Sequence, residues 1–245
     1  MDPVFAGLGF LVGFLIGLTG VGGGSLMTPS LIFLGVEPLT AVGTDLLYAT
    51  VTRVFGVLFH GKRGHVRRDI AFRLLVGSVP AVLIGGYAVR SIPKDVLNSH
   101  LTLVLGAILV VTATLSFLKG ELHLPLRPRW AYVYLLGFIV GLTVQFTSVG
   151  AGVIVSFALM NVARVNPREV VGTTILYGLV LSAMSFLSYA GMNNVDYSLA
   201  GTLVIGTVPG VYIGTHFNAS ADREDLKRAI NLVILLIGLF TLLGK

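Results

Sequence analysis

The chain contains no cysteine, and only 11% of its 245 residues are charged. The missing cysteine excludes disulfides, thiolate catalysis and thiolate metal sites. The low charge is unusual for a soluble domain, in which about 25% of residues are charged. Hydrophobic residues make up 55% of the chain, and several uninterrupted apolar runs reach about 20 residues, the length that crosses a bilayer. The sequence therefore predicts an all-α polytopic membrane protein.

The chain also lacks the motifs of membrane-embedded enzymes. It has no HExxH, no GxSxG and no pair of intramembrane aspartates, and the glycine cluster GVGGG at 20–24 is not followed by Gly-Lys-Ser/Thr. These absences argue against hydrolase, metalloprotease and nucleotide-binding functions. We therefore expect no enzyme, no catalytic residue, no metal site and no cofactor.

Two stretches of the chain match at a constant offset of 129 residues. AVGTDLLY at 41–48 matches VVGTTILY at 170–177, and GSVPAVLIGG at 77–86 matches GTVPGVYIGT at 206–215. Further upstream, GLTGVGGGS at 17–25 resembles GLTVQFTSVGAG at 141–152, with a few residues inserted in the second copy. Internal repeats of this kind are common in secondary transporters.

Each repeat is expected to hold one short helical hairpin, re-entrant or broken, followed by three transmembrane helices. The first repeat covers 1–118, a cytoplasmic linker covers 119–129, and the second repeat covers 130–245. The expected elements of the first repeat are a hairpin at 4–34 and helices at 40–59, 70–89 and 96–118. Those of the second repeat are a hairpin at 130–162 and helices at 167–189, 198–217 and 226–243.

The distribution of Lys and Arg predicts that the two repeats are inverted relative to each other. The loop HGKRGHVRRD at 60–69 holds four of these residues, whereas its counterpart YAGMNNVDYS at 189–198 holds none. Because cytoplasmic loops collect Lys and Arg, the first loop is expected in the cytoplasm and the second outside. Because successive spans cross the inner (plasma) membrane in alternating directions, both termini are then expected on its outer side. The net charge of +6 then reflects topology, and no nucleic-acid partner is expected.

The glycine clusters fall where the tips of the two hairpins are expected. A helix over 25–34 is about 15 Å long at 1.5 Å per residue, half of the roughly 30 Å hydrocarbon core. Non-helical backbone at that depth is tolerated where it lines a cavity, and glycine amides at the start of a returning helix attract an anion. Alternatively, the glycines only permit close helix packing. The candidate tip residues are Gly20, Gly22, Gly23, Gly24, Ser25, Ser148, Gly150 and Gly152, with Thr28 and Thr147 as further hydroxyl donors.

Polar residues inside the helix at 40–59 are the other candidates. A charge at the bilayer centre costs roughly 2.5–3.5 kcal/mol on insertion scales, so Asp45 either couples transport to a proton or cation or is satisfied by a neighbouring helix. Arg53 either balances the charge of a bound anion or extends to the inner surface. The counterparts Tyr48 and Tyr177 either donate hydroxyls to a substrate or are packing residues.

The combined pattern resembles the TauE/SafE family of bacterial and archaeal anion transporters over essentially the whole chain. The matching segments are GLTGVGGGSLMTPSL, AVGTDLLYATVTRVFG and GSVPAVLIGG in the first half, and SVGAGVIVSFAL, NPREVVGTTILYGLV and GTVPGVYIGT in the second. The resemblance implies that the substrate is sulfite or an organosulfonate such as sulfoacetate. It also implies that Thr44 and Thr173 join Asp45 and the glycine tips in the site. Thr174 is the counterpart of Asp45, so the two halves are chemically unequal.

The leading hypothesis is a secondary transporter in the lipid bilayer that alternates access to a small anion around opposed hairpin tips. An anion channel would share these features, because two re-entrant segments that meet at the midplane also build a filter. A membrane subunit of a larger complex is a further alternative, and a homo-oligomer is compatible with each.

Overall fold

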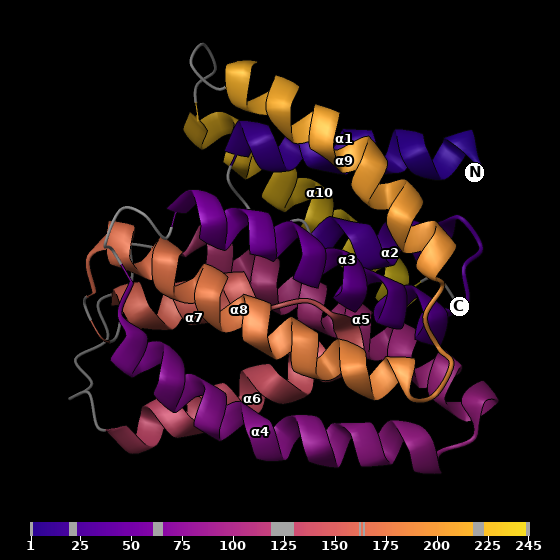
Figure 1. Cartoon of the computed structure of the whole chain (residues 1–245), viewed down its shortest axis with the longest axis horizontal. Helices are drawn as coiled ribbons and strands as arrows, with labels where there is room; N and C mark the ends of the chain where they lie inside the picture. The colour runs from indigo at the N-terminus through magenta and orange to yellow at the C-terminus, as the bar shows by residue number, and fades with distance from the viewer. Residues whose placement is uncertain are drawn as a thin grey trace.

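The computed structural model describes residues 2–19, 24–60, 66–118, 130–161, 163, 165–217 and 223–243. Within these ranges it contains ten helices and no strand (Figure 1). The first half supplies α1 (Pro3–Thr19), α2 (Gly24–Phe33), α3 (Pro38–His60), α4 (Arg68–Ser91) and α5 (Lys94–Phe117). The second half supplies α6 (Trp130–Thr147), α7 (Ala151–Asn161), α8 (Pro167–Ala190), α9 (Tyr197–Phe217) and α10 (Arg223–Leu243). The predicted all-α fold is confirmed.

Several helices have the length and composition of membrane spans. Five qualify among the described residues, namely Arg68–Ser91, Lys94–Phe117, Trp130–Thr147, Glu169–Ala190 and Tyr197–His216. Large apolar side chains cover their outer faces, for example Phe72 and Leu83 on α4 and Tyr212 on α9. Large apolar patches are rare on protein surfaces in contact with water, whereas the hydrocarbon core of a bilayer accommodates them. The protein is therefore a multi-pass membrane protein.

Two helices, α2 and α7, are much shorter than the others. They contain 10 and 11 residues, which corresponds to about 15–17 Å, and neither reaches across a hydrocarbon core of about 30 Å. Figure 1 shows α2 toward the end of the protein at which α1 begins, and α7 toward the opposite end. Each is preceded by a longer helix, α1 or α6, which is the order of elements expected for the predicted short hairpins at 4–34 and 130–162.

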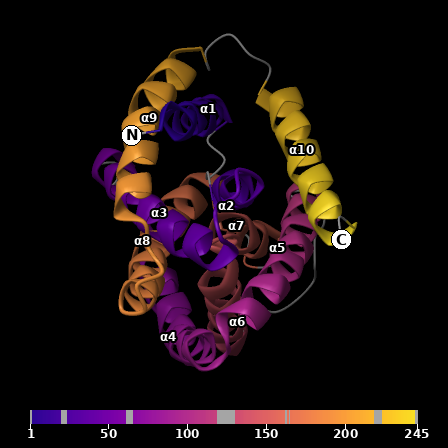
Figure 2. The same ribbon diagram turned by 90° about the vertical axis from the view of Figure 1, so that its right-hand side faces the viewer.

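The first half of the chain packs against the second half along helix pairs. Helix α1 lies along α9, α4 lies along α6, and α5 lies along α10 (Figure 2). Glycines allow the backbones to approach closely: Gly9 of α1 faces the carbonyl of Leu203, and Gly137 of α6 faces the carbonyl of Leu74. Leu74 and Leu203 are counterparts at the offset of 129 residues, so the same contact occurs twice between the two halves.

Helices α3 and α8 pack against each other and run in opposite directions. The Thr50 hydroxyl of α3 donates to Ser182 Oγ at 3.1 Å, and Arg53 Nη1 donates to the carbonyl of Gly178 at 3.0 Å. Residue numbers thus rise along α3 as they fall along α8. The two helices are counterparts in the repeat, and counterparts that run in opposite directions are what inverted repeats require. The inversion across a bilayer, the cytoplasmic linker at 119–129 and the division into repeats at 1–118 and 130–245 stay predictions.

The hairpins align without the insertion that the sequence comparison predicted. Helix α1 ends at Thr19 and α6 ends at Thr147, and Gly13 and Gly141 make corresponding contacts with α9 and α4. Both pairs are 128 residues apart. The prediction of a few inserted residues before SVGAG was wrong because the GLT motifs were paired one helical turn out of register. The segment between α7 and α8 is one residue longer than the segment between α2 and α3, and this restores the offset of 129 residues.

Candidate functional site

Asp45 of α3 is a fully buried carboxyl, with an exposed fraction of 0%. Thr28 of α2 donates a hydrogen bond of 2.5 Å to its Oδ2 atom. Its Oδ1 atom has no hydrogen-bond partner among the described residues. Because a buried carboxylate oxygen without a donor is unfavourable, Oδ1 is a place where a proton or a ligand gains free energy by binding.

The turn between α6 and α7 brings a second polar side chain to this carboxyl. Ser148 follows the last residue of α6 and lies beside Asp45, yet its Oγ atom makes no well-formed hydrogen bond within the described ranges. Its side chain is 1% exposed. Its φ of 60° lies in the left-handed region, which is uncommon outside glycine. Residues held in such conformations cluster at ligand sites.

Helix α7 begins at Ala151, immediately after this turn. The N–H groups of its first turn have no acceptor within the helix and carry a partial positive charge. Gly150 has a φ of 107° and shapes the turn, whereas a Cβ atom on Gly152 would meet nothing within 4 Å. Open space beside the start of a helix suits an anion. The first turn of α2 holds Ser25, whose buried Oγ atom is likewise without a partner among the described residues.

The two counterpart tyrosines make the same contact in opposite halves. Tyr48 OH lies 3.0 Å from Thr207 Oγ1, and Tyr177 OH lies 2.8 Å from Ser78 Oγ. Thr207 donates to the carbonyl of Gly9, and Ser78 donates to the carbonyls of Leu74 and Gly137. Since a hydroxyl has one proton, each tyrosine is the donor in its pair. Both phenols therefore bind helices of the opposite half, an arrangement that suits packing.

Two further candidates, Thr44 and Thr173, each accept a hydrogen bond from the backbone of a loop. The Oγ1 atom of Thr44 accepts a hydrogen bond of 3.0 Å from the backbone N–H of Asp196. Its counterpart Thr173 accepts one of 3.0 Å from the N–H of Arg67. Each threonine thus fixes the residues that precede α9 or α4 in the other half.

Arg53 is half-buried between α3 and α8. Besides the hydrogen bond to Gly178, it interacts electrostatically with Asp45 and Tyr177. A Cβ atom on Gly178 would lie 3.1 Å from Arg53 Nε, so this glycine makes room for the guanidinium. The Arg53 guanidinium therefore points to the interior of the protein, where its positive charge attracts the negative charge of an ionised Asp45.

The remaining predicted tip residues fall at or beyond the edge of what the structure describes. Gly20, Gly22 and Gly23 lie outside the described residues, and Gly24 is the first residue of α2. Sequence reasoning did not single out Ser78 and Thr207 as partners of the tyrosines. Their signal was present, since both follow the glycine of the matched motifs GSVP and GTVP.

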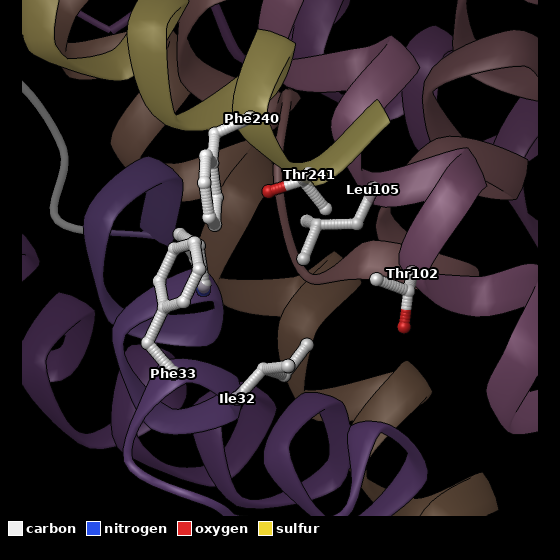
Figure 3. Close-up of a pocket in the computed structure, with 7 residues that line it drawn as sticks. Ile32, Phe33, Thr102, Leu105, Phe240 and Thr241 are labelled. Carbon is white, nitrogen blue, oxygen red and sulfur yellow. The ribbon is translucent and has the colours of Figure 1, made fainter. Parts of the chain in front are cut away.

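Two further features of the described residues bear on where a ligand could bind. Within the described ranges, no group of three or more His, Cys, Asp or Glu side chains is placed to hold a metal ion. A groove between α2, α5 and α10 is lined by Pro29, Ile32, Phe33, Thr102, Leu105, Phe240 and Thr241 (Figure 3). It carries no charged side chain and suits a hydrocarbon chain better than a small anion.

Comparisons with known proteins agree with this architecture. The family model described as Sulfite exporter TauE/SafE matches residues 5–241. The probable membrane transporter protein YjnA of Bacillus subtilis is 32% identical over 95% of this chain and 96% of its own length. YdhB of the same organism, also named a probable membrane transporter protein, is 29% identical over 95% of this chain and 97% of its own length. No solved structure gives a significant match. The chain is thus a membrane transporter and not an enzyme, and it belongs to the TauE/SafE sulfite exporter family.

Proposed function

We propose that this chain carries a small anion, either sulfite or an organosulfonate such as sulfoacetate, across the inner membrane by alternating access around its two hairpin tips. The observation that carries the proposal is the turn at 148–150. It places an unpartnered Ser148 hydroxyl and the start of α7 beside Asp45, with open space next to Gly152. Partial positive charge without a full cation binds an anion but also releases it, as a carrier requires.

The substrate class rests on the match to the family described as Sulfite exporter TauE/SafE. Sulfite and sulfonates present three oxygens that accept hydrogen bonds from first-turn amides and hydroxyls. Ser25, Ser148 and the amides of residues 150–152 are the groups we assign to the substrate. Arg53 balances charge nearby, and Tyr48 and Tyr177 hold the helices that frame the site.

The membrane orientation belongs to the same proposal. The antiparallel contacts of α3 with α8 support an inverted pair of repeats, and α1 begins at the same end of the protein at which α10 ends (Figure 1). With the Lys- and Arg-rich loop at 60–69 in the cytoplasm, both termini lie outside. Opposed half-depth helices then open the site to one side at a time.

Flux measurements in liposomes test the proposed function. Purified protein is reconstituted, and uptake of labelled sulfite, sulfoacetate and methanesulfonate is compared with uptake by protein-free liposomes. At least one anion should enter with saturable kinetics, and counterflow should accelerate it. Uptake equal to that of empty liposomes for all three, or single-channel currents in place of counterflow, would overturn the proposal.

A matched pair of variants locates the site. Gly152→Leu fills the open space beside α7 and should abolish uptake. Gly201→Leu also places a side chain where a Cβ would meet nothing within 4 Å, but on α9, and uptake should persist. Equal effects of the two substitutions would contradict the placement of the anion at α7.

A further inference from the structure

The pairing of Asp45 with Ser148 has a chemical consequence for the anion. Both side chains are buried, and Asp45 Oδ1 and Ser148 Oγ each lack a hydrogen-bond partner among the described residues although they lie beside each other. Thr28 occupies only the Oδ2 atom of the carboxyl. The Oδ1 atom and the Ser148 hydroxyl therefore lie together where α3 meets the turn that precedes α7.

Few other titratable groups face this pair. The described residues of α2 and α7 include none. On α3 itself, Arg53 and Tyr48 interact with Asp45, and α8 contributes Tyr177, which interacts with Arg53. Among the described residues, the other charged or titratable groups of the helices packed against α3 are Lys94, Asp95 and His100 of α5, Glu169 and Tyr189 of α8, and Tyr197, Tyr212 and His216 of α9. Of these, Tyr189 is buried and lies against Gly43 of α3, and its hydroxyl donates to the carbonyl of Gln145 at 2.9 Å. Asp45 is thus the carboxyl of the site.

A serine hydroxyl has one proton to donate, and this fixes how Asp45 affects the anion. When Asp45 is ionised, Ser148 donates its proton to Oδ1, and only oxygen lone pairs remain toward an anion. When Asp45 is protonated, its carboxyl donates to Ser148 Oγ, and the hydroxyl proton of Ser148 is released toward the anion. Loss of the carboxylate charge removes electrostatic repulsion at the same time.

We infer that each transported anion travels with one proton bound to the Asp45 carboxyl, and that Ser148 links the binding of the proton to the binding of the anion. The inference rests on the proposed function and adds its coupling ion. The proton enters the carboxyl from water on one side and leaves to water on the other, with no bond formed in the anion. Transport of a monovalent anion is therefore electroneutral.

The repeat indicates that the chain has a single such carboxyl. The counterpart of Asp45 is Thr174, whose hydroxyl donates to the carbonyls of Val170 and Val171 in its own helix. The counterpart of Ser148 at the offset of 128 is Gly20, which has no hydroxyl. One proton per transport cycle follows from this asymmetry.

Uptake driven by an imposed proton gradient is the first arm of the test. The labelled anions are the same three as in the flux assay, and methanesulfonate keeps its charge at all working pH values. One pH unit, acid outside, should drive accumulation of up to about tenfold for a monovalent anion, whereas an imposed sodium gradient or membrane potential should not. Saturable flux without a response to the proton gradient overturns the coupling and leaves the transport proposal standing. Absence of flux overturns both.

Anion binding is the second arm, because it needs no transport. By linkage, a proton that favours the anion makes affinity fall as pH rises, typically by about 5- to 150-fold for coupled sites. In Asp45→Asn this pH dependence should disappear, whereas the exposed control Asp95→Asn should keep it. Persistence in Asp45→Asn overturns the inference. If Asp45→Asn fails to fold, Ser148→Ala provides the same readout, because it keeps the carboxyl and removes the hydroxyl that joins it to the anion; unchanged pH dependence there also overturns it.

Discussion

Addition of one methyl group to the glycines where α1 meets α9 and α6 meets α4 is expected to destabilise the protein. A Cβ atom at Gly13 would lie 2.6 Å from the carbonyl oxygen of Thr207, and one at Gly141 would lie 2.9 Å from the Cβ of Ala81. Ordinary van der Waals contact starts at 3.4 Å, so Gly13→Ala forces α1 away from α9 by about 0.8 Å and Gly141→Ala displaces α6 by a smaller amount.

Overpacking of this kind typically costs about 1–3 kcal/mol. For a chain of this size, 1 kcal/mol corresponds to about 2–4 °C in Tm, so the apparent Tm should fall by about 2–12 °C. The loss should be larger for Gly13→Ala, because the atom it meets belongs to the backbone. Helix α9, against which Gly13 packs, also carries Thr207, which accepts the hydrogen bond of Tyr48.

Intrinsic fluorescence of the purified protein in detergent during heating measures the effect. The controls are Gly7→Ala on α1 and Gly201→Ala on α9, where an added Cβ meets nothing within 4 Å. Since alanine is favoured over glycine in a helix by about 1 kcal/mol, the controls should keep or raise their Tm. Equal Tm values for the packed glycines and the controls would refute the close approach of these helices.

The remaining predictions concern topology and the tyrosine hydroxyls. Because the chain has no cysteine, the single variants Arg68→Cys and Tyr197→Cys can be labelled selectively; these counterpart positions lie where α4 and α9 begin. An impermeant maleimide should label Tyr197→Cys on intact cells and Arg68→Cys only after permeabilisation. Labelling of both variants from the same side would contradict the inversion. Tyr48→Phe and Tyr177→Phe should each lower Tm by about 1–6 °C, because each loses a hydrogen bond of about 0.5–1.5 kcal/mol. The control Tyr212→Phe, at a lipid-facing position, should leave Tm unchanged. Equal Tm values for the three variants would show that the buried hydroxyl pairs do not contribute to stability.

The helices and the correspondence between the two halves could be predicted where the signal repeats along the chain. Apolar length defined the spans, and the offset of 129 residues related α3 to α8 before any contact was known. The burial of Asp45 followed from the high cost of an exposed charge in lipid. These properties depend on composition and period, which a single sequence displays directly.

The contacts of individual hydroxyls could not be predicted in the same way. Thr28 was a general hydroxyl donor in the sequence, and only the packing of α2 on α3 shows that it meets Asp45. The left-handed φ of Ser148 has no sequence signal, since serine rarely adopts it. The roles of Tyr48 and Tyr177 could not be decided from the sequence. The helical period places each tyrosine on one face of its helix but does not show which other helix covers that face.

The pairing of α1 with α9 also constrains how the polypeptide is made. Gly9 and Gly13 leave the ribosome nearly 200 residues before Leu203 and Thr207, which they meet. Contacts this distant along the chain form slowly. Until then α1 sits in the lipid with its glycine face uncovered, open to association with a wrong helix or with another nascent chain. The packing of α1 is therefore a late step in the biogenesis of this protein, and truncation before α9 leaves α1 without its partner.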